Sequence, residues 1–546
     1  MALLLNIFLS HFMIKRKLNN FFKEGWLVSW KPFAILFAVI FIVYSQSIFF
    51  ELTYLDDNTL ILDRSEVISD LSTIKTVFSS DAFFSNNRLY YRPMLNLSFM
   101  ADAQFGVFNY PAYHISNLLW HFLAVILVFI LLKRLSRRPL FSFLATLIFA
   151  IHPAIVQAVV WLPGRNDSLV AVFILAAFLS FLNYYRKPNL KFLLIYSFLF
   201  FLSLLSKETS LFFPLLSFAY LLTIGRDKKL TKMQIALLII LPAIVAAFWF
   251  ALRYYALGGN QIGVSAALNS IFINLLPSIA MGAKMFLPFN LSVLPVSADT
   301  SFFLSLIAWP AFIFACFYFR AKNIGTFLFG IFWFAIFFFP PFIVSSGAPF
   351  LLEHRLYLPL VGILIALSSF DNIKNFSWQN KQGRIIVVSV LVLFALISFF
   401  HSRKFSNPLV FWKSAVLSSP SSPLAHKNLG VMYYFSGDYI NAEREYNMSL
   451  KVNPQEVMSN NNLGLIYMSR GDYWRAEAAF LRELSINPGY DKSLANLTEL
   501  YFRNGKYKEA KVYALEALRI NPDLDSVNGL LPLINQNLNK TEDSLK

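Results

Sequence analysis

Apolar stretches separated by short polar ones fill the chain from its beginning to Ser402. Each stretch is close to the roughly 20 residues that a helix needs to cross a bilayer. We predict spans near residues 32–50, 115–132, 139–155, 167–184, 190–206, 209–224, 233–252, 302–319, 325–343, 351–370 and 385–401. The pattern therefore predicts an all-α protein whose first part is a polytopic helical membrane domain of about eleven spans.

Basic side chains gather in alternate polar segments, at residues 15–31, 133–138, 186–187, 226–232, 320–322 and 374–384. Loops rich in lysine and arginine stay in the cytoplasm. We therefore place the N-terminal segment 1–31 in the cytoplasm and the first long polar loop, 51–113, outside. An odd number of spans puts the C-terminal part on the periplasmic or other extracytoplasmic side as well.

One apolar stretch, residues 270–290, does not read as a span. It is broken by Pro277, Lys284 and Pro288. The basic residues that follow require an even number of crossings between 253 and 300. We expect none, with residues 270–290 lying on or re-entering the outer face.

The net charge of +17 would suggest nucleic acid as the partner of a soluble protein. Here the basic residues follow the topology, so we predict no nucleic-acid partner. The single cysteine, Cys316, excludes an intrachain disulfide and a cysteine-based metal site.

A repeat follows the membrane domain, which we assign to residues 32–402. Leu429, Tyr433, Ala442 and Pro454 recur every 34 residues, at 463, 467, 476 and 488 and again at 497, 501, 510 and 522. This is the tetratricopeptide (TPR) pattern of paired helices. We predict a half-repeat connector at 403–422, repeats at 423–456, 457–490 and 491–524, and a capping helix with a tail at 525–546.

Polar side chains at the outer ends of the spans are the candidates for chemistry, because ionisable groups at membrane depth are costly and mark substrate paths. Asp56 and Asp57 can take a proton from an attacking hydroxyl or bind a hard cation. Basic side chains suit a phosphate: Arg92, Arg165, Lys207 and Arg355. The supporting polar residues are His114, His152, Glu208, Glu353 and His354.

Together these groups suit attack on a sugar–phosphate bond, which needs a base on one side and positive charge at the leaving phosphate. Hydrolysis of the same bond needs the same groups, so the chemistry alone does not name the acceptor. A divalent metal at the two carboxylates stays open.

The segments that carry these residues resemble the transmembrane-and-TPR O-mannosyltransferase-like (TMTC) family and its bacterial relatives. The matching segments are Tyr91-Arg92-Pro93, His152-Pro153, Gly164-Arg165-Asn166-Asp167, Ser206-Lys207-Glu208 and Glu353-His354-Arg355-Leu356-Tyr357-Leu358-Pro359. The resemblance implies a C-type glycosyltransferase fold, a polyprenyl-phosphate sugar as donor, and one of the two aspartates as catalytic base. The chain departs from the family at Gln157, where eukaryotic members often carry an acid.

The leading hypothesis is an integral-membrane glycosyltransferase that moves a sugar from a polyprenyl phosphate to a hydroxyl outside the cytoplasm. The resemblance suggests mannose as the sugar and protein Ser or Thr as the acceptor. A second hypothesis is a non-catalytic scaffold whose repeats bind proteins. A transporter would carry charged or broken segments in mid-membrane, whereas the polar residues here gather at one face.

Asn428, Asn462 and Asn496 recur one residue before the leucine of each repeat. An amide side chain both donates and accepts hydrogen bonds, so a row of amides suits the backbone of an extended polypeptide. The row resembles the asparagine ladder of the O-linked N-acetylglucosamine transferases. We predict that it binds the acceptor polypeptide.

Overall fold

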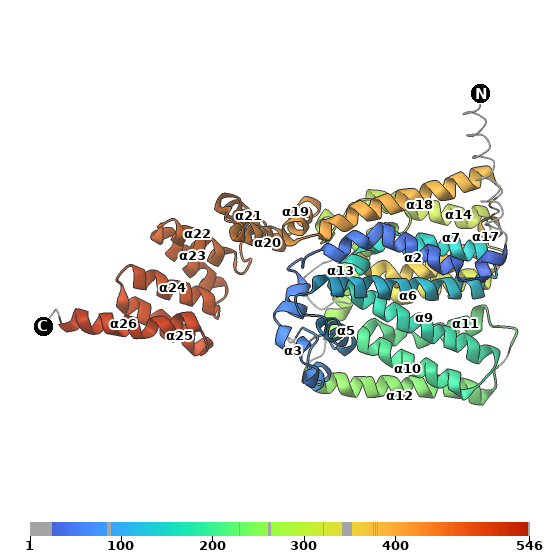
Figure 1. The fold of residues 1–546 in the computed structure, drawn as a ribbon, viewed down its shortest axis with the longest axis horizontal. Coiled ribbons are helices and arrows are strands. Elements are labelled where there is room, and N and C mark those ends of the chain that lie inside the picture. Colours follow the sequence, from blue (N-terminus) through green and yellow to red (C-terminus); the bar gives the residue numbers. More distant parts are fainter. Residues whose placement is uncertain are drawn as a thin grey trace, which may run out of the picture. The chain divides into compact units, whose positions relative to one another are not determined.

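The computed structural model describes residues 24–83, 89–228, 230–259, 264–319, 321–340, 352–374, 376, 378 and 380–543. Within them every regular element is helical, which confirms the predicted all-α class. The chain divides into two compact units, Met1–Phe411 and Trp412–Lys546 (Figure 1). Most of the predicted cytoplasmic segment and the junction of the spans predicted at 325–343 and 351–370 lie outside the described residues.

The first unit contains the apolar helices. Its α-helices are α2 (Lys31–Tyr44), α3 (Ser65–Ser69), α4 (Ile74–Ser79), α5 (Pro93–Ala103), α6 (Tyr110–Ser136), α7 (Pro139–Ala150), α8 (Val156–Val160), α9 (Arg165–Arg186), α10 (Leu190–Ser206), α11 (Pro214–Thr223), α12 (Lys232–Leu257), α13 (Val264–Ala283), α14 (Phe303–Phe319), α15 (Ile324–Phe338), α16 (Tyr357–Leu367), α17 (Asp371–Lys374) and α18 (Lys381–Ser402). Short turns of helix join them: η1 (Glu24–Val28), η2 (Ser45–Phe49), η3 (Asn58–Leu62), η4 (Leu71–Thr73), η5 (Pro153–Ile155), η6 (Leu162–Gly164), η7 (Glu208–Phe212), η8 (Ser297–Asp299), η10 (Glu353–Leu356) and η11 (Arg403–Phe405).

Five helical segments in the described part of the chain are long and apolar enough to cross a bilayer. They are Lys31–Phe49, Tyr110–Ser136, Leu162–Arg186, Lys232–Leu257 and Lys381–Phe405. A sixth is present if α7 and the following Pro153–Val160, which meet at a bend of 52°, form one span. The chain is thus an integral, multi-pass membrane protein. Several other predicted spans are shorter apolar helices, so the count of eleven stays a prediction.

Helix α9 lies at the centre of this unit. It packs against α6, α10 and α16, and most of its side chains are buried. Helices α12 and α18 run along opposite edges of the ribbon in Figure 1 and expose apolar side chains such as Ile240 and Ile386. A helix that is apolar on all faces and exposed on its outer one suits contact with lipid.

Two helices, α15 and α16, touch through glycine. A Cβ atom built on Gly330 would lie 2.4 Å from the backbone nitrogen of Ala366. One built on Gly362 would lie 2.5 Å from that of Phe334. Small residues allow such close approach of helices in membranes. The contact fixes α16, and the η10 turn that precedes it, against α15.

The second unit is a series of antiparallel helix pairs, as the repeat predicts. After α19 (Pro408–Ser418), the pairs are α20 (Pro423–Phe435) with α21 (Tyr439–Val452), α22 (Ser459–Ser469) with α23 (Tyr473–Ile486), and α24 (Asp491–Arg503) with α25 (Tyr507–Ile520). Helix α26 (Asp525–Asp543) follows. The turns within the pairs contain Gly437, Gly471 and Gly505 at φ values of +78°, +75° and +71°, the left-handed region that favours glycine.

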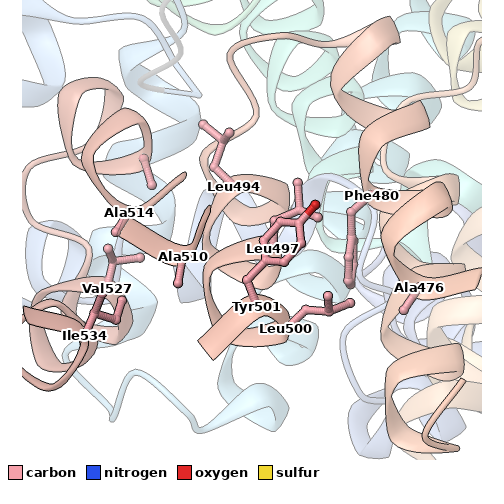
Figure 2. Close-up of a cluster of buried hydrophobic side chains, with 11 residues drawn as sticks. Ala476, Phe480, Leu494, Leu497, Leu500, Tyr501, Ala510, Ala514, Val527 and Ile534 are labelled. Atoms are coloured by element: carbon pink, nitrogen blue, oxygen red, sulfur yellow. The ribbon is translucent and has the colours of Figure 1, made fainter. Parts of the chain in front are cut away.

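Small residues face aromatic ones inside the repeats. A Cβ atom on Gly464 would lie 2.5 Å from the Phe480 ring, and one on Gly430 would lie 2.6 Å from Tyr446. Figure 2 shows Phe480 of α23 beside Leu497 and Tyr501 of α24, with buried side chains of α25 and α26 beyond them. Each unit of the repeat therefore packs on the next, and the predicted tetratricopeptide fold is confirmed.

Candidate functional site

A cavity of about 580 Å³ brings together side chains that are far apart in the sequence. Its ionisable lining residues include Asp56, Arg92, Asp167, Lys207, Glu208, Arg253, His354 and Arg355. Aromatic side chains form much of the remaining wall: Phe83, Tyr90, Trp161, Trp249 and Phe250. Four basic side chains and three carboxylates thus share one concave site, together with one histidine.

The two adjacent aspartates have different surroundings. Asp57 is 1% exposed, and its carboxylate accepts hydrogen bonds from the backbone nitrogens of Thr53 (2.6 Å), Leu55 (3.1 Å) and Asn58 (3.1 Å). The Thr53 hydroxyl donates to the same carboxylate at 2.9 Å. Asp57 therefore holds its own loop together, and Asp56 is the aspartate that lines the cavity.

A hydrogen bond also links the loop to Trp161 in the cavity wall. The Trp161 indole N–H donates to Thr53 Oγ1 at 3.1 Å, and Trp161 is a lining residue. Tyr54 adopts a left-handed backbone conformation, with φ 58°, which is costly for a residue with a Cβ. The hydrogen bonds of Asp57 stabilise the turn that contains this residue.

Burial and the neighbouring charge of Asp57 raise the pKa of Asp56 and Arg92 lowers it, so that the pKa is about 6. A carboxylate with this pKa is largely ionised at neutral pH. It also binds a proton more readily than an ordinary aspartate does. These are the properties of a general base.

Two of the basic side chains of the cavity, Arg92 and Lys207, are already paired with carboxylates. Arg92 contacts Glu208 at 3.1 Å and lies over the Tyr90 ring, 4.6 Å from its centroid. The Lys207 ammonium donates to both oxygens of Asp167, at 2.7 and 2.8 Å. The lining thus keeps positive charge at membrane depth by giving it acidic partners.

Arg165 lies elsewhere. Its guanidinium is 0% exposed and is held between α5, α6 and α9. It donates to the Asn117 side chain (2.5 Å), to Asp102 (2.5 Å) and to the Tyr113 carbonyl (2.7 Å), and it lies over the Phe99 ring at 4.6 Å. The structure therefore does not bring this predicted phosphate ligand to the cavity.

Three of the predicted supporting residues are also buried behind the lining. His114 packs edge-on against Phe50. His152 contacts the Met285 carbonyl at 3.1 Å through Nε2. The Glu353 carboxylate accepts from Lys284 Nζ at 2.6 Å and from the Ser292 backbone nitrogen at 3.0 Å. Glu208 and His354, by contrast, line the cavity.

Several lining residues were not among the predicted site residues, chiefly Arg253, Trp249 and Phe250 of α12. Arg253 donates to the Leu89 carbonyl at 3.3 Å, so it links α12 to the non-helical segment that contains Arg92. The signal in the sequence is its place directly after the apolar span predicted at 233–252.

The three repeat asparagines lie on the first helix of each pair and are partly exposed. Asn496 Nδ2 donates to the Asn461 side chain at 2.8 Å, and Asn461 Nδ2 donates to Asn462 at 3.3 Å. The second and third repeats are thus joined by an amide contact between Asn496 and Asn461, the neighbour of Asn462.

No group of three or more His, Cys, Asp or Glu side chains in the described part of the chain is arranged to hold a metal ion.

Comparison with known proteins matches residues 491–524 to a tetratricopeptide repeat family. The protein O-mannosyl-transferase TMTC3 of Mus musculus is 31% identical over 159 residues, which cover 28% of this chain and 17% of that protein. The protein O-mannosyl-transferase F38B6.6 of Caenorhabditis elegans is 23% identical over 457 residues, covering 77% of this chain and 62% of that protein. The matches span less than two thirds of each relative, and they confirm the resemblance to the TMTC proteins.

Among solved structures, ArnT from Cupriavidus metallidurans bound to undecaprenyl phosphate is similar with a TM-score of 0.39 and 15% identity, covering 83% of this chain and 79% of that one.

The packing of Arg165 predicts a structural phenotype. Arg165→Met would leave the Asp102 carboxylate buried without its cation, a change that costs about 3–5 kcal/mol. We expect loss of folded protein, measured by thermal unfolding in detergent. The double variant Arg165→Met/Asp102→Asn should recover part of the loss. Arg253→Gln, at the more open cavity, should remain folded, and equal stability of all three variants with the parent would contradict the assignment.

Proposed function

We propose that this protein is an integral-membrane glycosyltransferase that moves a sugar from a polyprenyl phosphate to the hydroxyl of a protein Ser or Thr outside the cytoplasm. One observation carries the proposal: a single cavity contains both an ionisable carboxylate with a raised pKa and a group of basic side chains. The similarity to protein O-mannosyl-transferases supports this class of reaction and favours mannose as the sugar.

Asp56 would act as the base. It takes the proton of the acceptor hydroxyl as the oxygen attacks the anomeric carbon of the donor. The bond between that carbon and the phosphate oxygen breaks, and its electron pair leaves with the polyprenyl phosphate. The products are the new glycoside, the free polyprenyl phosphate and protonated Asp56.

Arg92, Lys207 and Arg355 would stabilise the charge that develops on the leaving phosphate. All three line the same cavity as Asp56. Arginine can bind two phosphate oxygens at once through its planar fork, whereas lysine acts as a point charge. Arg165, with its buried partners, would hold α5, α6 and α9 in place instead.

The repeats would bind the acceptor polypeptide through Asn428, Asn462 and Asn496. These amides lie on successive first helices and are partly exposed. Their donors and acceptors can pair with a peptide backbone whatever its side chains are, which suits an enzyme that acts on different serine and threonine sites.

The two aspartates should differ when they are changed. Asp56→Asn keeps the size of the side chain but removes its basicity, so transfer of labelled sugar from a polyprenyl phosphate to membrane protein should fall about a hundredfold or more. Asp57→Asn replaces an acceptor of the Thr53 N–H by an NH₂ group, and should cost about 1–3 kcal/mol of stability, measured by thermal unfolding. Loss of transfer in Asp57→Asn together with loss of stability in Asp56→Asn would exchange the two roles. Full activity of both variants would exclude this site.

The pH profile should report Asp56. The base acts when it is deprotonated, so kcat/KM should rise with pH through about 6, where the pKa of Asp56 lies, and then level off. Arg92 lowers this pKa, so Arg92→Gln should move the midpoint to a higher pH. Arg355→Gln should lower activity without the same displacement. A midpoint that is unchanged in Arg92→Gln would argue against Asp56 as the titrating group.

Loss of the asparagine row should affect large acceptors alone. The triple variant Asn428→Ala/Asn462→Ala/Asn496→Ala should modify polypeptides at least tenfold more weakly, because each lost hydrogen bond is worth roughly 0.5–1.5 kcal/mol. Asn461 Oδ1 would still accept from Ser493 at 2.9 Å, so the repeat should fold. Transfer to a small acceptor serves as the control. Unchanged transfer to protein would favour the scaffold hypothesis for the repeats.

A further inference from the structure

Gln157 joins two segments behind the cavity through a single buried amide. Its Nε2 donates to the Val293 carbonyl at 3.1 Å. Its Oε1 contacts the His354 backbone nitrogen at 3.2 Å and His354 Nδ1 at 3.1 Å. Gln157 is 1% exposed, so water does not replace these partners.

The two backbone groups determine which way the amide points. The Val293 carbonyl can only accept a hydrogen bond, so the amide nitrogen must face it. The His354 backbone N–H can only donate, so the amide oxygen must face that side. The orientation therefore follows from hydrogen-bond chemistry.

The same oxygen faces His354 Nδ1, and an amide oxygen cannot donate. Nδ1 must therefore carry the proton of the neutral ring. The other nitrogen, Nε2, is then left with a lone pair. Its charged neighbour on the cavity lining is Asp167, whose Oδ2 lies 3.7 Å away and is also an acceptor.

We propose that Gln157 positions His354 as the Nδ1–H tautomer, so that Nε2 accepts a hydrogen bond from a hydroxyl of the sugar bound in the cavity. Two acceptors side by side, one neutral and one anionic, select a polyol rather than a second phosphate. The identity of the ligand as a sugar rests on the proposed function. The tautomer and its control by Gln157 do not.

The surroundings of His354 keep the ring neutral. The residue lies in the η10 turn, directly before α16. The ring is buried, and the positive charges of Lys207, Arg355 and Arg92 act on it, so both burial and charge oppose its protonation. The facing acid, Asp167, is itself paired with Lys207. The Trp161 ring covers one side, with centroids 5.7 Å apart.

Nitrogen-15 labelling of histidine tests the tautomer directly in the full-length protein. The chain has seven histidines, and subtraction of the His354→Gln spectrum identifies the signals of His354. We expect the chemical shifts of a neutral ring protonated at Nδ1 near pH 7. Gln157→Met removes the acceptor at similar volume and should give the other tautomer or a mixture. Gln157→Glu places a carboxylate at Nδ1 and should make the ring cationic at higher pH.

An Nε2–H tautomer in the parent, or an unchanged His354 signal in Gln157→Met, would overturn the proposal. The remaining histidine signals show whether each variant is folded, and the spectrum of the parent decides the tautomer even if a variant is not.

The sugar contact is tested separately, with donors that lack one hydroxyl each. With the parent protein, removal of one particular hydroxyl from the donor should lower kcat/KM at least tenfold. With His354→Gln, removal of the same hydroxyl should lower kcat/KM only slightly further, because the contact is already lost. Equal losses for the parent and His354→Gln on every donor would exclude the contact. A protein with the Nδ1–H tautomer but no transfer of sugar would refute the proposed function alone.

Discussion

A charge held at membrane depth must have a partner of opposite sign or contact with water, and this constraint determines how the residues at the cavity end of the transmembrane unit are arranged. Lys207 lies against Asp167, Arg92 against Glu208, Arg165 against Asp102 and Lys284 against Glu353. Each pair joins segments that are distant in the sequence. The pairs therefore do two things at once: they make the burial of charge tolerable, and they bring the loops between the helices together around one cavity.

Local patterns were sufficient to predict much of the architecture. Apolar runs predict membrane helices because lipid leaves few alternatives for the backbone, and the recurrence of Leu429, Tyr433 and Ala442 predicts paired helices because their contacts lie within a single repeat. Span number was harder to derive. Short helices such as α11 and α15 are too brief to be assigned by length alone.

The details of the site depend on tertiary contacts that no local pattern contains. Asp56 and Asp57 are adjacent and chemically identical, and only the turn through Tyr54 decides which of them meets the cavity. Arg165 and Arg355 both lie in short polar segments between apolar stretches, yet α9 directs the first toward α5 and α6. Gln157 is one polar residue in an apolar stretch, and its importance depends on Val293 and His354, which are both more than a hundred positions away.

The acidic partners of Arg92 and Lys207 have a consequence for turnover. Any phosphate that enters the cavity competes with Glu208 and Asp167 for the same cations, so the net attraction is the difference between two similar interactions. A site built in this way holds a phosphate less tightly than a site with unpaired cations would. In the proposed reaction the donor and the spent carrier lipid would both carry phosphate, and Glu208 and Asp167 would limit the affinity for each. Product inhibition should then be weak, because the cavity would regain its own ion pairs as the carrier departs.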